Sequence, residues 1–454
     1  MRQNIIRITM LLVLVVLCMW QIVILWLGDM SGHNFLEKTD AAQHIIVVQP
    51  KSMWINVGKL AYKIDETKRE YSALVNELGL LIKEGAKGAT LQENIDLEYE
   101  DVLSMSGILY EYDLSIGVKD LVGSILDGME KDIIIDQVFV DMGLYNDHKT
   151  NLYLIASDTG RIDRVTIYNR LEAHQKMITK FNSPVVTQNL IGYQPTITSN
   201  KKQYIKRSSF YPLNTKDAPI EYEVLKVSNP IEQGTTEGRL EALEGYVNSF
   251  FANPLLKKVN QGEDGTIVFS ENMKAVVKYD PMGTLEFSMT SVNQQPKLTG
   301  AQRLKMVMGF IENCSGIPEF LKEGIYLSEI TQQGEEYVYQ FNYKHKGFGV
   351  QLTDKVKQQL GLSHILQISI RNNQVVGGKW SILDIDTHID SGVVKDQVVR
   401  GFDEIVDTMY ERYITEGHQQ KPLDVVQCRY IMDTLEGNVK LNWVVLFEGN
   451  WYYP

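Results

Sequence analysis

Cysteine and positive charge are both scarce in this sequence of 454 residues. The chain has three cysteines, Cys18, Cys314 and Cys428, too few for a disulfide-built scaffold or a cysteine-rich zinc site. Lysine and arginine number 45 against 57 aspartate and glutamate residues, which gives a net charge of −12. A general nucleic-acid binder needs a basic surface to neutralise phosphates. This balance therefore argues against a nucleic-acid partner.

The sequence motifs of common active sites are also missing. We find no G-x-S-x-G serine elbow, H-E-x-x-H zinc helix, Walker loop or dinucleotide-binding glycine loop. The acidic run 384–392 suggests a calcium loop, but the sixth and twelfth positions of such a loop, which require Gly and Glu, hold Ile389 and Lys395. We interpret this run as a strand end and a turn. We predict no enzyme activity, no cofactor or metal, and no small-molecule substrate.

What the sequence does contain is one long apolar segment near its start. Residues 8–27 are twenty residues without a charge, and at about 1.5 Å each a helix of this length spans the roughly 30 Å core of a membrane. Arg2 and Arg7 precede the segment and Asp29 follows it. Because basic residues stay on the cytoplasmic side, we expect a single-pass protein of the cell membrane with a cytoplasmic N-terminus. A cleaved signal peptide is the alternative, although its apolar region is usually about 7–15 residues.

The fold class that we predict is α+β, with the transmembrane helix followed by three mixed α/β extracellular domains whose sheets are mainly antiparallel. The cytoplasmic tail and transmembrane helix occupy residues 1–28, and a polar linker follows at 29–40. An N-terminal mixed α/β domain covers 41–182. A middle, β-rich domain with one helix covers 183–296, and a C-terminal α+β domain covers 297–454.

Each domain contains elements that the residue pattern places. Apolar residues recur at i, i+3 and i+4 in the expected helices and alternate or cluster in the expected strands. We expect helices at residues 65–84, 118–129, 171–181, 236–251, 299–313 and 397–413. We expect strands at residues 44–49, 133–141, 151–157, 161–168, 265–269, 275–279, 284–290, 326–330, 337–343, 366–371, 374–385, 427–433 and 441–447.

The second and third domains carry a pattern that resembles the YycH family. The resemblance rests on VNSFFANP at residues 247–254, DGTIVFS at 264–270 and AVVKYDPMGTLEF at 275–287. The helix-strand pattern of residues 299–350 and the terminal strand ending in Gly449-Asn450-Trp451 look like the C-terminal domain that YycH shares with YycI. One N-terminal span and a large extracellular region match the architecture of that family.

This resemblance implies regulation rather than catalysis. Proteins of the family are membrane-anchored accessory factors of the two-component system that controls the cell wall in low-GC Gram-positive bacteria. They pair with YycI and act on the sensor histidine kinase through membrane helices. For this chain, the resemblance implies a sensor histidine kinase and a YycI-like single-span protein as partners. We expect Leu14, Cys18, Gln21 and Leu25 of the span to form the contact.

Alternatives of other classes stay open at this point. One is a non-catalytic extracellular binding module for a wall polymer or lipid, and another is an anchored enzyme that acts on peptidoglycan. Cys314 and Cys428 either form a disulfide or remain free and buried. The aromatic residues near the C-terminus either form a docking patch or pack into the core: Trp443, Phe447, Trp451, Tyr452 and Tyr453.

Overall fold

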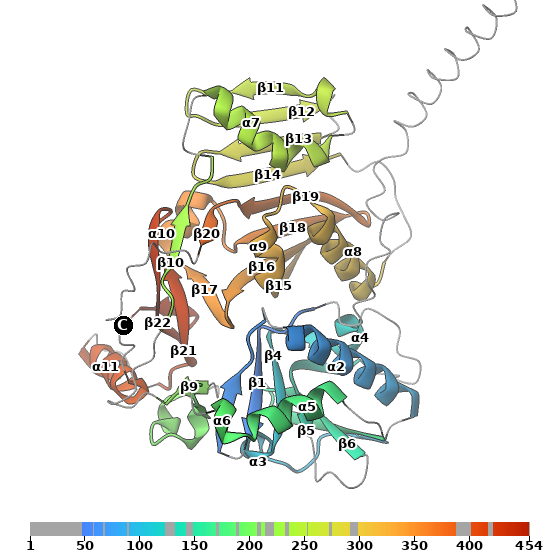
Figure 1. Cartoon of the computed structure of the whole chain (residues 1–454), viewed down its shortest axis with the longest axis vertical. Helices are drawn as coiled ribbons and strands as arrows, with labels where there is room; N and C mark the ends of the chain where they lie inside the picture. Colours follow the sequence, from blue (N-terminus) through green and yellow to red (C-terminus); the bar gives the residue numbers. More distant parts are fainter. Residues whose placement is uncertain are drawn as a thin grey trace, which may run out of the picture.

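The computed structural model of the chain describes residues 48–453 except for short stretches, the longest of which are 123–131, 142–148, 214–221, 291–297, 387–400 and 416–420. Two large β-sheets with helices around them make up the described part (Figure 1). The prediction of a mixed helix-and-strand fold with mainly antiparallel sheets is confirmed.

The first sheet has nine strands in the order β3-β7-β6-β5-β4-β1-β2-β8-β9, and all neighbours pair antiparallel. Its central strands are buried on both faces, with Val138 and Val140 facing one cluster of apolar side chains and Phe139 facing another. The strands are β1 Ser52–Val57, β2 Leu60–Lys63, β3 Thr90–Gln92, β4 Gly107–Gly117, β5 Ile134–Asp141, β6 Lys149–Ala156, β7 Arg161–Tyr168, β8 Tyr193–Pro195 and β9 Phe210–Pro212.

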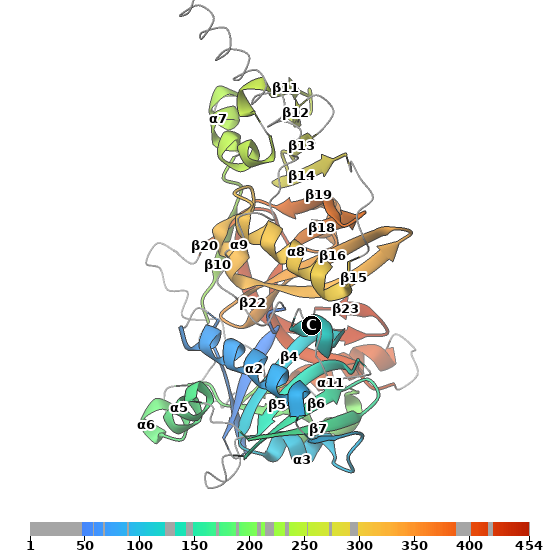
Figure 2. The ribbon, with the colours of Figure 1, turned by 90° about the vertical axis from the view of Figure 1, so that its right-hand side faces the viewer.

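Helices cover both faces of this first sheet. The long helix α2 buries Leu74, Leu78 and Leu81 at helical spacing, and α5 packs beside it (Figure 2). The short helix α3 closes the opposite face with Val102 and Leu103. The helices are α2 Arg69–Gly88, α3 Tyr99–Ser104, α4 Val118–Leu121, α5 Glu172–Phe181 and α6 Pro184–Thr187, with 3₁₀ turns at Thr196–Thr198 and Lys202–Tyr204.

The second sheet has fourteen strands, twelve of them in the order β11-β12-β13-β14-β19-β18-β16-β17-β21-β22-β10-β20. Strand β15 pairs with β16, and β23 pairs with β22. The strands are β10 Leu225–Ser228, β11 Lys258–Gln261, β12 Ile267–Glu271, β13 Ala275–Asp280, β14 Thr284–Met289, β15 Ile325–Gln333, β16 Glu336–His345, β17 Phe348–Leu352, β18 Leu366–Arg371, β19 Gln374–Ser381, β20 Asp384–Asp386, β21 Val425–Met432, β22 Gly437–Phe447 and β23 Asn450–Tyr452.

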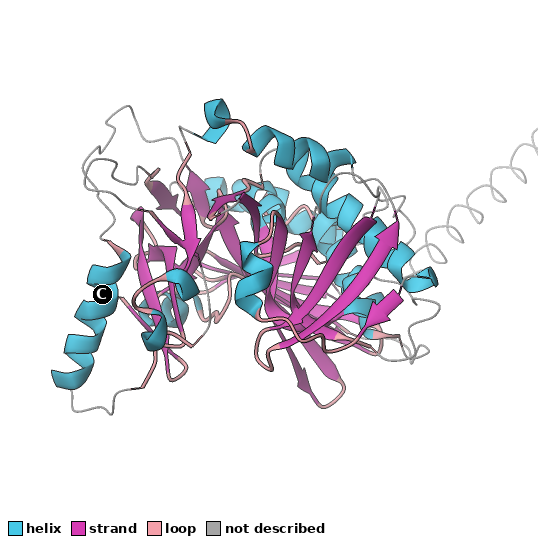
Figure 3. Cartoon of the chain, turned by 90° about the horizontal axis from the view of Figure 1, so that it is seen from below, coloured by secondary structure: helices cyan, strands magenta, loops and turns pink. Residues whose placement is uncertain are grey.

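Helices lie around the outside of the strands in this half too (Figure 3). Helix α8 begins with a capping box, in which the Thr299 side chain accepts from the backbone of Gln302 and the Gln302 side chain accepts from the backbone of Thr299. The helices are α7 Thr236–Val247, α8 Gly300–Asn313, α9 Glu319–Gly324, α10 Asp354–Leu360 and α11 Phe402–Thr415, with 3₁₀ turns at Asn248–Phe250 and Pro254–Leu256.

The path of the chain places its C-terminal part between the two earlier parts (Figure 1). The first sheet lies at the bottom, and the chain then runs to α7 and β11–β14 at the top before it returns to the middle. Strand β14 pairs with β19, and β10 pairs with β22, so segments far apart in the sequence complete one sheet. Strands β8 and β9, which follow residue 182, extend the first sheet.

Of the expected strand at residues 44–49, positions 44–47 lie outside the described residues. The described residues of that run, 48 and 49, are not in a strand, and β1 begins at Ser52. The apolar pattern did not predict β1, because this strand contains the polar residues Ser52 and Asn56. Both side chains are buried and hydrogen-bonded. Strand β4 was also not predicted, although it pairs with both β1 and β5.

The predicted membrane span at 8–27 and the linker at 29–40 lie outside the described residues. Of the residues that the structure does describe, none belong to a helix that is both long and apolar enough to cross a membrane. The span and the cell-membrane location therefore stay predictions.

Candidate functional site

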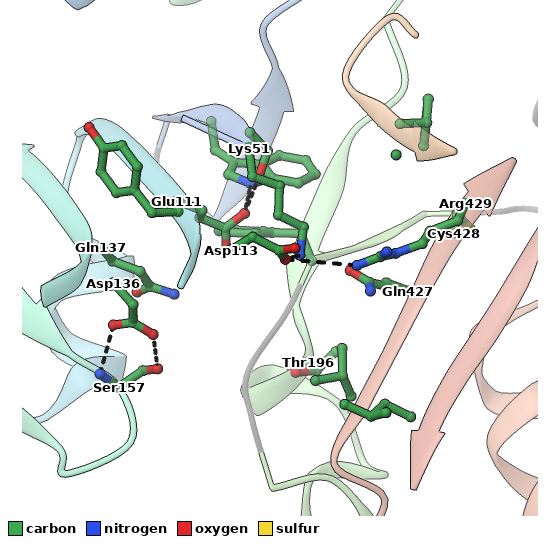
Figure 4. Close-up of a pocket in the computed structure, with 18 of the residues that line it drawn as sticks. Lys51, Glu111, Asp113, Asp136, Gln137, Ser157, Thr196, Gln427, Cys428 and Arg429 are labelled. Atoms are coloured by element: carbon green, nitrogen blue, oxygen red, sulfur yellow. Dashed lines mark hydrogen bonds and ion pairs between the residues drawn. The ribbon is translucent and has the colours of Figure 1, made fainter. Parts of the chain in front are cut away.

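A cleft of about 830 Å³ lies between the first sheet and the C-terminal half of the second. Figure 4 shows acidic side chains of β4 and β5 on one side and Arg429 of β21 on the other. Residues of the 196–206 segment and of β17 complete the walls. Clefts between domains are frequent ligand sites, so we take this one as the candidate functional site.

The carboxylate of Glu111 is held at one wall of the cleft by two neighbours on β1. The hydroxyl of Ser52 donates to it, and the indole Nε1 of Trp54 donates to the same oxygen at 2.6 Å. Trp54 is itself stacked on Phe210, with ring centroids 4.4 Å apart. Glu111 is therefore fixed in orientation by the sheet that carries it.

Asp113 joins the two sheets at the edge of the cleft. It pairs with Lys51 at 2.7 Å, accepts a hydrogen bond of 2.6 Å from the hydroxyl of Ser328, and lies 4.0 Å from the guanidinium of Arg429. Burial raises the pKa of Asp113, but the nearby charges of Lys51 and Arg429 outweigh that effect and hold its pKa at about 2. Asp113 is thus a permanent anion near neutral pH.

Arg429 is positioned by its own neighbours rather than left free for a ligand. It is 4% exposed, donates to Gln351 at 2.8 Å, and lies over the ring of Trp451 at 4.6 Å. Trp451 thus reaches the cleft wall, whereas Trp443 and Phe447 are buried in the core. The core-packing interpretation of the C-terminal aromatics holds for these last two residues.

Lys63 enters the cleft between two aromatic rings. Its ammonium lies 5.0 Å from the centre of the Trp54 ring and 4.0 Å from that of Phe348. Within the described residues, no hydrogen bond or ion pair holds it. Burial lowers the pKa of Lys63 to about 8, although Glu66 and Glu111 oppose the shift. A lysine of this kind is partly neutral just above physiological pH.

A third carboxylate of the cleft, Asp136, faces Ser157. The backbone N–H of Ser157 donates to it at 2.8 Å, and the Ser157 hydroxyl donates to its other oxygen. Burial raises the pKa of Asp136 against these hydrogen bonds. Each cleft carboxylate described here is therefore already bound by protein groups.

The sequence-predicted site residues fall elsewhere. Leu14, Cys18, Gln21 and Leu25 lie outside the described residues. Cys314 and Cys428 are both free thiols, so the alternative of a disulfide between them is wrong. Cys314 is buried and Cys428 lines the cleft. Among the described residues, no three or more side chains of metal-binding type converge.

Sequence reasoning missed the cleft because its residues follow no motif. Glu111 and Asp113 lie on β4, but the other charged residues come from three further segments: Lys51 precedes β1, Lys63 ends β2 and Asp136 lies on β5. One weak signal was present, in the charged residues that interrupt otherwise apolar strands at 107–117 and 134–141. Such residues are buried only when a partner is supplied by another part of the chain.

The arrangement of the two sheets has a counterpart among solved structures. The crystal structure of YycH from Bacillus subtilis matches 90% of this chain and 96% of its own, with a TM-score of 0.55 and 11% sequence identity. The chain has the YycH fold. The resemblance to YycH that the sequence predicted is thus confirmed.

A solved structure of an uncharacterised protein from Eubacterium rectale matches 57% of this chain and 88% of its own. Its TM-score is 0.33 at 10% identity, which is too low to support an argument. No protein-family model and no curated protein matches the chain. The YycH fold therefore rests on the three-dimensional arrangement, because the two amino-acid sequences are only 11% identical.

Proposed function

We propose that this chain is a single-pass, membrane-anchored extracellular regulator of a sensor histidine kinase in a cell-wall two-component system. It acts by packing its transmembrane helix on the helices of the kinase, together with a YycI-like single-span partner. The observation that carries the proposal is the YycH fold, which extends over 90% of this chain. The uncharged segment 8–27 supports the anchoring.

The physical basis of the mechanism is helix packing inside the membrane. Gln21 is a polar amide within an apolar segment, and such groups form hydrogen bonds between membrane helices. A packing preference of about 1–3 kcal/mol for one kinase state changes its activity roughly 5- to 150-fold. The extracellular part sets the position of the span. The contacts of Asp113 with Ser328 and Arg429 connect its two sheets, and a connected extracellular part can transmit a displacement to the span.

The first experiment is a pull-down from native membranes in mild detergent. It compares the full chain, a chain lacking residues 1–28 and a chain whose residues 8–27 are replaced by an unrelated leucine-rich span. A histidine kinase and a second single-span protein should come down with the full chain only. Recovery of the same partners with the leucine-rich span would contradict contact through this helix.

A point substitution tests the proposed contact more finely. Gln21→Leu should change kinase autophosphorylation in reconstituted vesicles by about fivefold or more, since it removes the amide from the helix surface. Val15→Leu, in the same segment but outside the four proposed contact residues, is the matched control and should leave activity unchanged. Equal effects of the two substitutions would exclude a specific role of Gln21.

The cleft favours one second candidate, an extracellular binding module for a wall polymer or lipid. Its walls combine aromatic rings, carboxylates and the ammonium of Lys63, which lies between the rings of Trp54 and Phe348. Titration of the full chain in detergent with soluble wall polymer, and with anionic lipid vesicles as a separate arm, tests this candidate. Binding that Lys63→Met abolishes would support it, and equal binding by the variant would exclude the cleft.

A further inference from the structure

Strand β11 is an open edge of the fourteen-stranded sheet. On its inner side it pairs with β12, and no described strand pairs with its outer side. Its four residues, Lys258–Gln261, are all exposed. It lies at the top of the molecule, remote from the cleft (Figure 1). Unpaired edges of this kind are templates for another strand.

The hairpin between β11 and β12 fixes which backbone groups face outward. The N–H of Gly262 donates to the carbonyl of Thr266 at 2.8 Å, so these two residues are a hydrogen-bonded pair. Such pairs alternate along an antiparallel ladder, and Asn260 and Lys258 therefore also direct their backbone groups towards β12. Val259 and Gln261 direct their N–H and C=O groups to the open edge.

Apolar side chains flank this edge. Val259 lies opposite Phe269, on the buried face of the sheet, yet it is 41% exposed. Leu255 and Leu256, in the turn just before β11, are 93% and 60% exposed. Asn253 fixes that turn by accepting a hydrogen bond of 3.1 Å from the N–H of Leu255. The turn therefore holds both leucines in solvent beside the open strand.

The charges along the segment indicate which strand fits. Lys258 stands at its start and Glu263 and Asp264 stand just past its end. Lys257 is not available, because it is paired with Glu244 at 2.9 Å. Lys258 and Glu263 are exposed, and neither has a side-chain partner among the described residues. A strand that runs antiparallel and carries the same order of charges is complementary to this edge.

A second copy of the chain meets all of these requirements. Two β11 strands that run antiparallel about a twofold axis at Asn260 place Val259 of each opposite Gln261 of the other. Their outward backbone groups then pair, and each Lys258 lies next to the acidic turn at Glu263 and Asp264 of the other copy. We propose that β11 is a homodimerisation edge, at which two copies join their sheets in this register.

A designed cross-link tests this register directly. Asn260→Cys places one thiol from each copy at the axis, in a non-hydrogen-bonded pair whose Cα atoms are about 4.5 Å apart, within the range that a disulfide needs. Lys258→Cys is the matched control, because it is on the same strand and the same face and is also exposed. Its counterpart lies four residues further along, roughly 13 Å away.

The full chain in native membranes, under mild oxidation, should give a covalent dimer of twice the chain mass with Asn260→Cys. The yield should exceed that of Lys258→Cys by about tenfold, and the parent chain, which keeps Cys18, Cys314 and Cys428, sets the background. Equal yields from the two variants, no dimer above background, or a cross-link to a different protein would each overturn the proposal.

Charge reversal supplies an independent readout in the Asn260→Cys chain. Lys258→Glu alone, or Glu263→Lys alone, places like charges side by side and should lower the dimer yield roughly two- to fivefold. The double reversal exchanges the two signs and should restore it. A double variant that stays as low as the single ones would overturn the proposed register.

Discussion

The hydroxyl of Ser328 donates a hydrogen bond of 2.6 Å to the carboxylate of Asp113, although 215 positions separate the two residues in the chain. Asp113 belongs to β4 of the first sheet and Ser328 to β15 of the second. The same carboxylate is paired with Lys51 at 2.7 Å. A single carboxylate thus closes the junction between the sheets at the edge of the cleft.

Asp113→Asn should loosen this junction. Relative to its ordinary value of 3.8, the pKa of Asp113 near 2 corresponds to about 2 kcal/mol of stability, which the amide loses. Urea denaturation of the full chain in mild detergent at pH 7 measures the change. Asp354→Asn is the control, because the Asp354 side chain is 98% exposed and, among the described residues, its one ion pair is with Lys357 in an i,i+3 arrangement. The control should shift the free energy of unfolding by less than about 0.5 kcal/mol, and equal effects of the two variants would contradict the prediction.

The same carboxylate predicts an acid dependence of stability. Because the pKa of Asp113 is lower in the folded chain than its usual 3.8, its contribution is complete above pH 4 and is lost as the pH falls towards 2. The difference in unfolding free energy between the wild type and Asp113→Asn should therefore shrink over this interval. Denaturation curves at pH 6, 4, 3 and 2 measure it. A difference that stays constant down to pH 2 would show that the charge of Asp113 does not stabilise the fold.

How far the sequence predicts this fold depends on whether an element is specified locally. Helix α8 was expected at 299–313 and spans Gly300–Asn313, because Thr299 and Gln302 cap it and its apolar residues recur at helical spacing. Strand β18 has the predicted bounds for the same kind of reason, because its buried residues alternate with half-buried or exposed ones. Elements of this kind can be predicted from the residues within them and at their ends.

Other elements exist only because of their partners. Strands β8 and β9 have three residues each and contain prolines, yet they pair with each other and β8 pairs with β2. Strand β4 begins at Gly107, where a side chain would collide with the carbonyl of Val140. The cleft is of the same kind, since the contact between Asp113 and Ser328 spans both sheets. A local pattern in the sequence does not show which distant residues make such contacts.

Lys344 predicts a change of stability at alkaline pH. It is 2% exposed, and its ammonium donates to the carbonyl of Pro50 at 2.6 Å and to the hydroxyl of Tyr71 at 3.0 Å. Burial lowers the pKa of Lys344 to about 8, against an opposing effect of Glu66. Between this value and the usual 10.5 the unfolded chain binds more protons than the folded chain, so stability rises with pH.

This rise should amount to about 1–2 kcal/mol for each such lysine between pH 8 and 9.5. Lys63 has a similarly lowered pKa of about 8, so each of the variants Lys344→Met and Lys63→Met should lose part of the rise and the double variant should lose both parts. Urea denaturation at pH 8, 9 and 9.5 measures it. Burial raises the pKa of Cys314 and Cys428, which opposes this rise over the same interval, so the readout is the difference in unfolding free energy between the wild type and each lysine variant. A difference that stays constant from pH 8 to 9.5 would contradict the prediction.

Two glycines with opposite surroundings give a last test of the packing. At Gly324, which ends α9, a Cβ atom would lie 2.4 Å from the ring of Tyr343 and 2.5 Å from the carbonyl of Lys344. At Gly245, inside α7, it would meet nothing within 4 Å. Gly324→Ala should therefore cost about 1–3 kcal/mol, because backbone of β16 cannot move aside as a flexible side chain would.

Gly245→Ala should instead stabilise the chain by about 0.5–1 kcal/mol, since alanine restricts the unfolded backbone and favours the helix. Thermal and urea unfolding of the two variants under identical conditions measure both signs. The comparison holds the chemical change constant, one added methyl group, so opposite signs can come only from the surroundings of each position. Loss of stability in Gly245→Ala would contradict the open surroundings of that position in α7. No loss in Gly324→Ala would contradict the packing of α9 on β16, which places Gly324 against Tyr343.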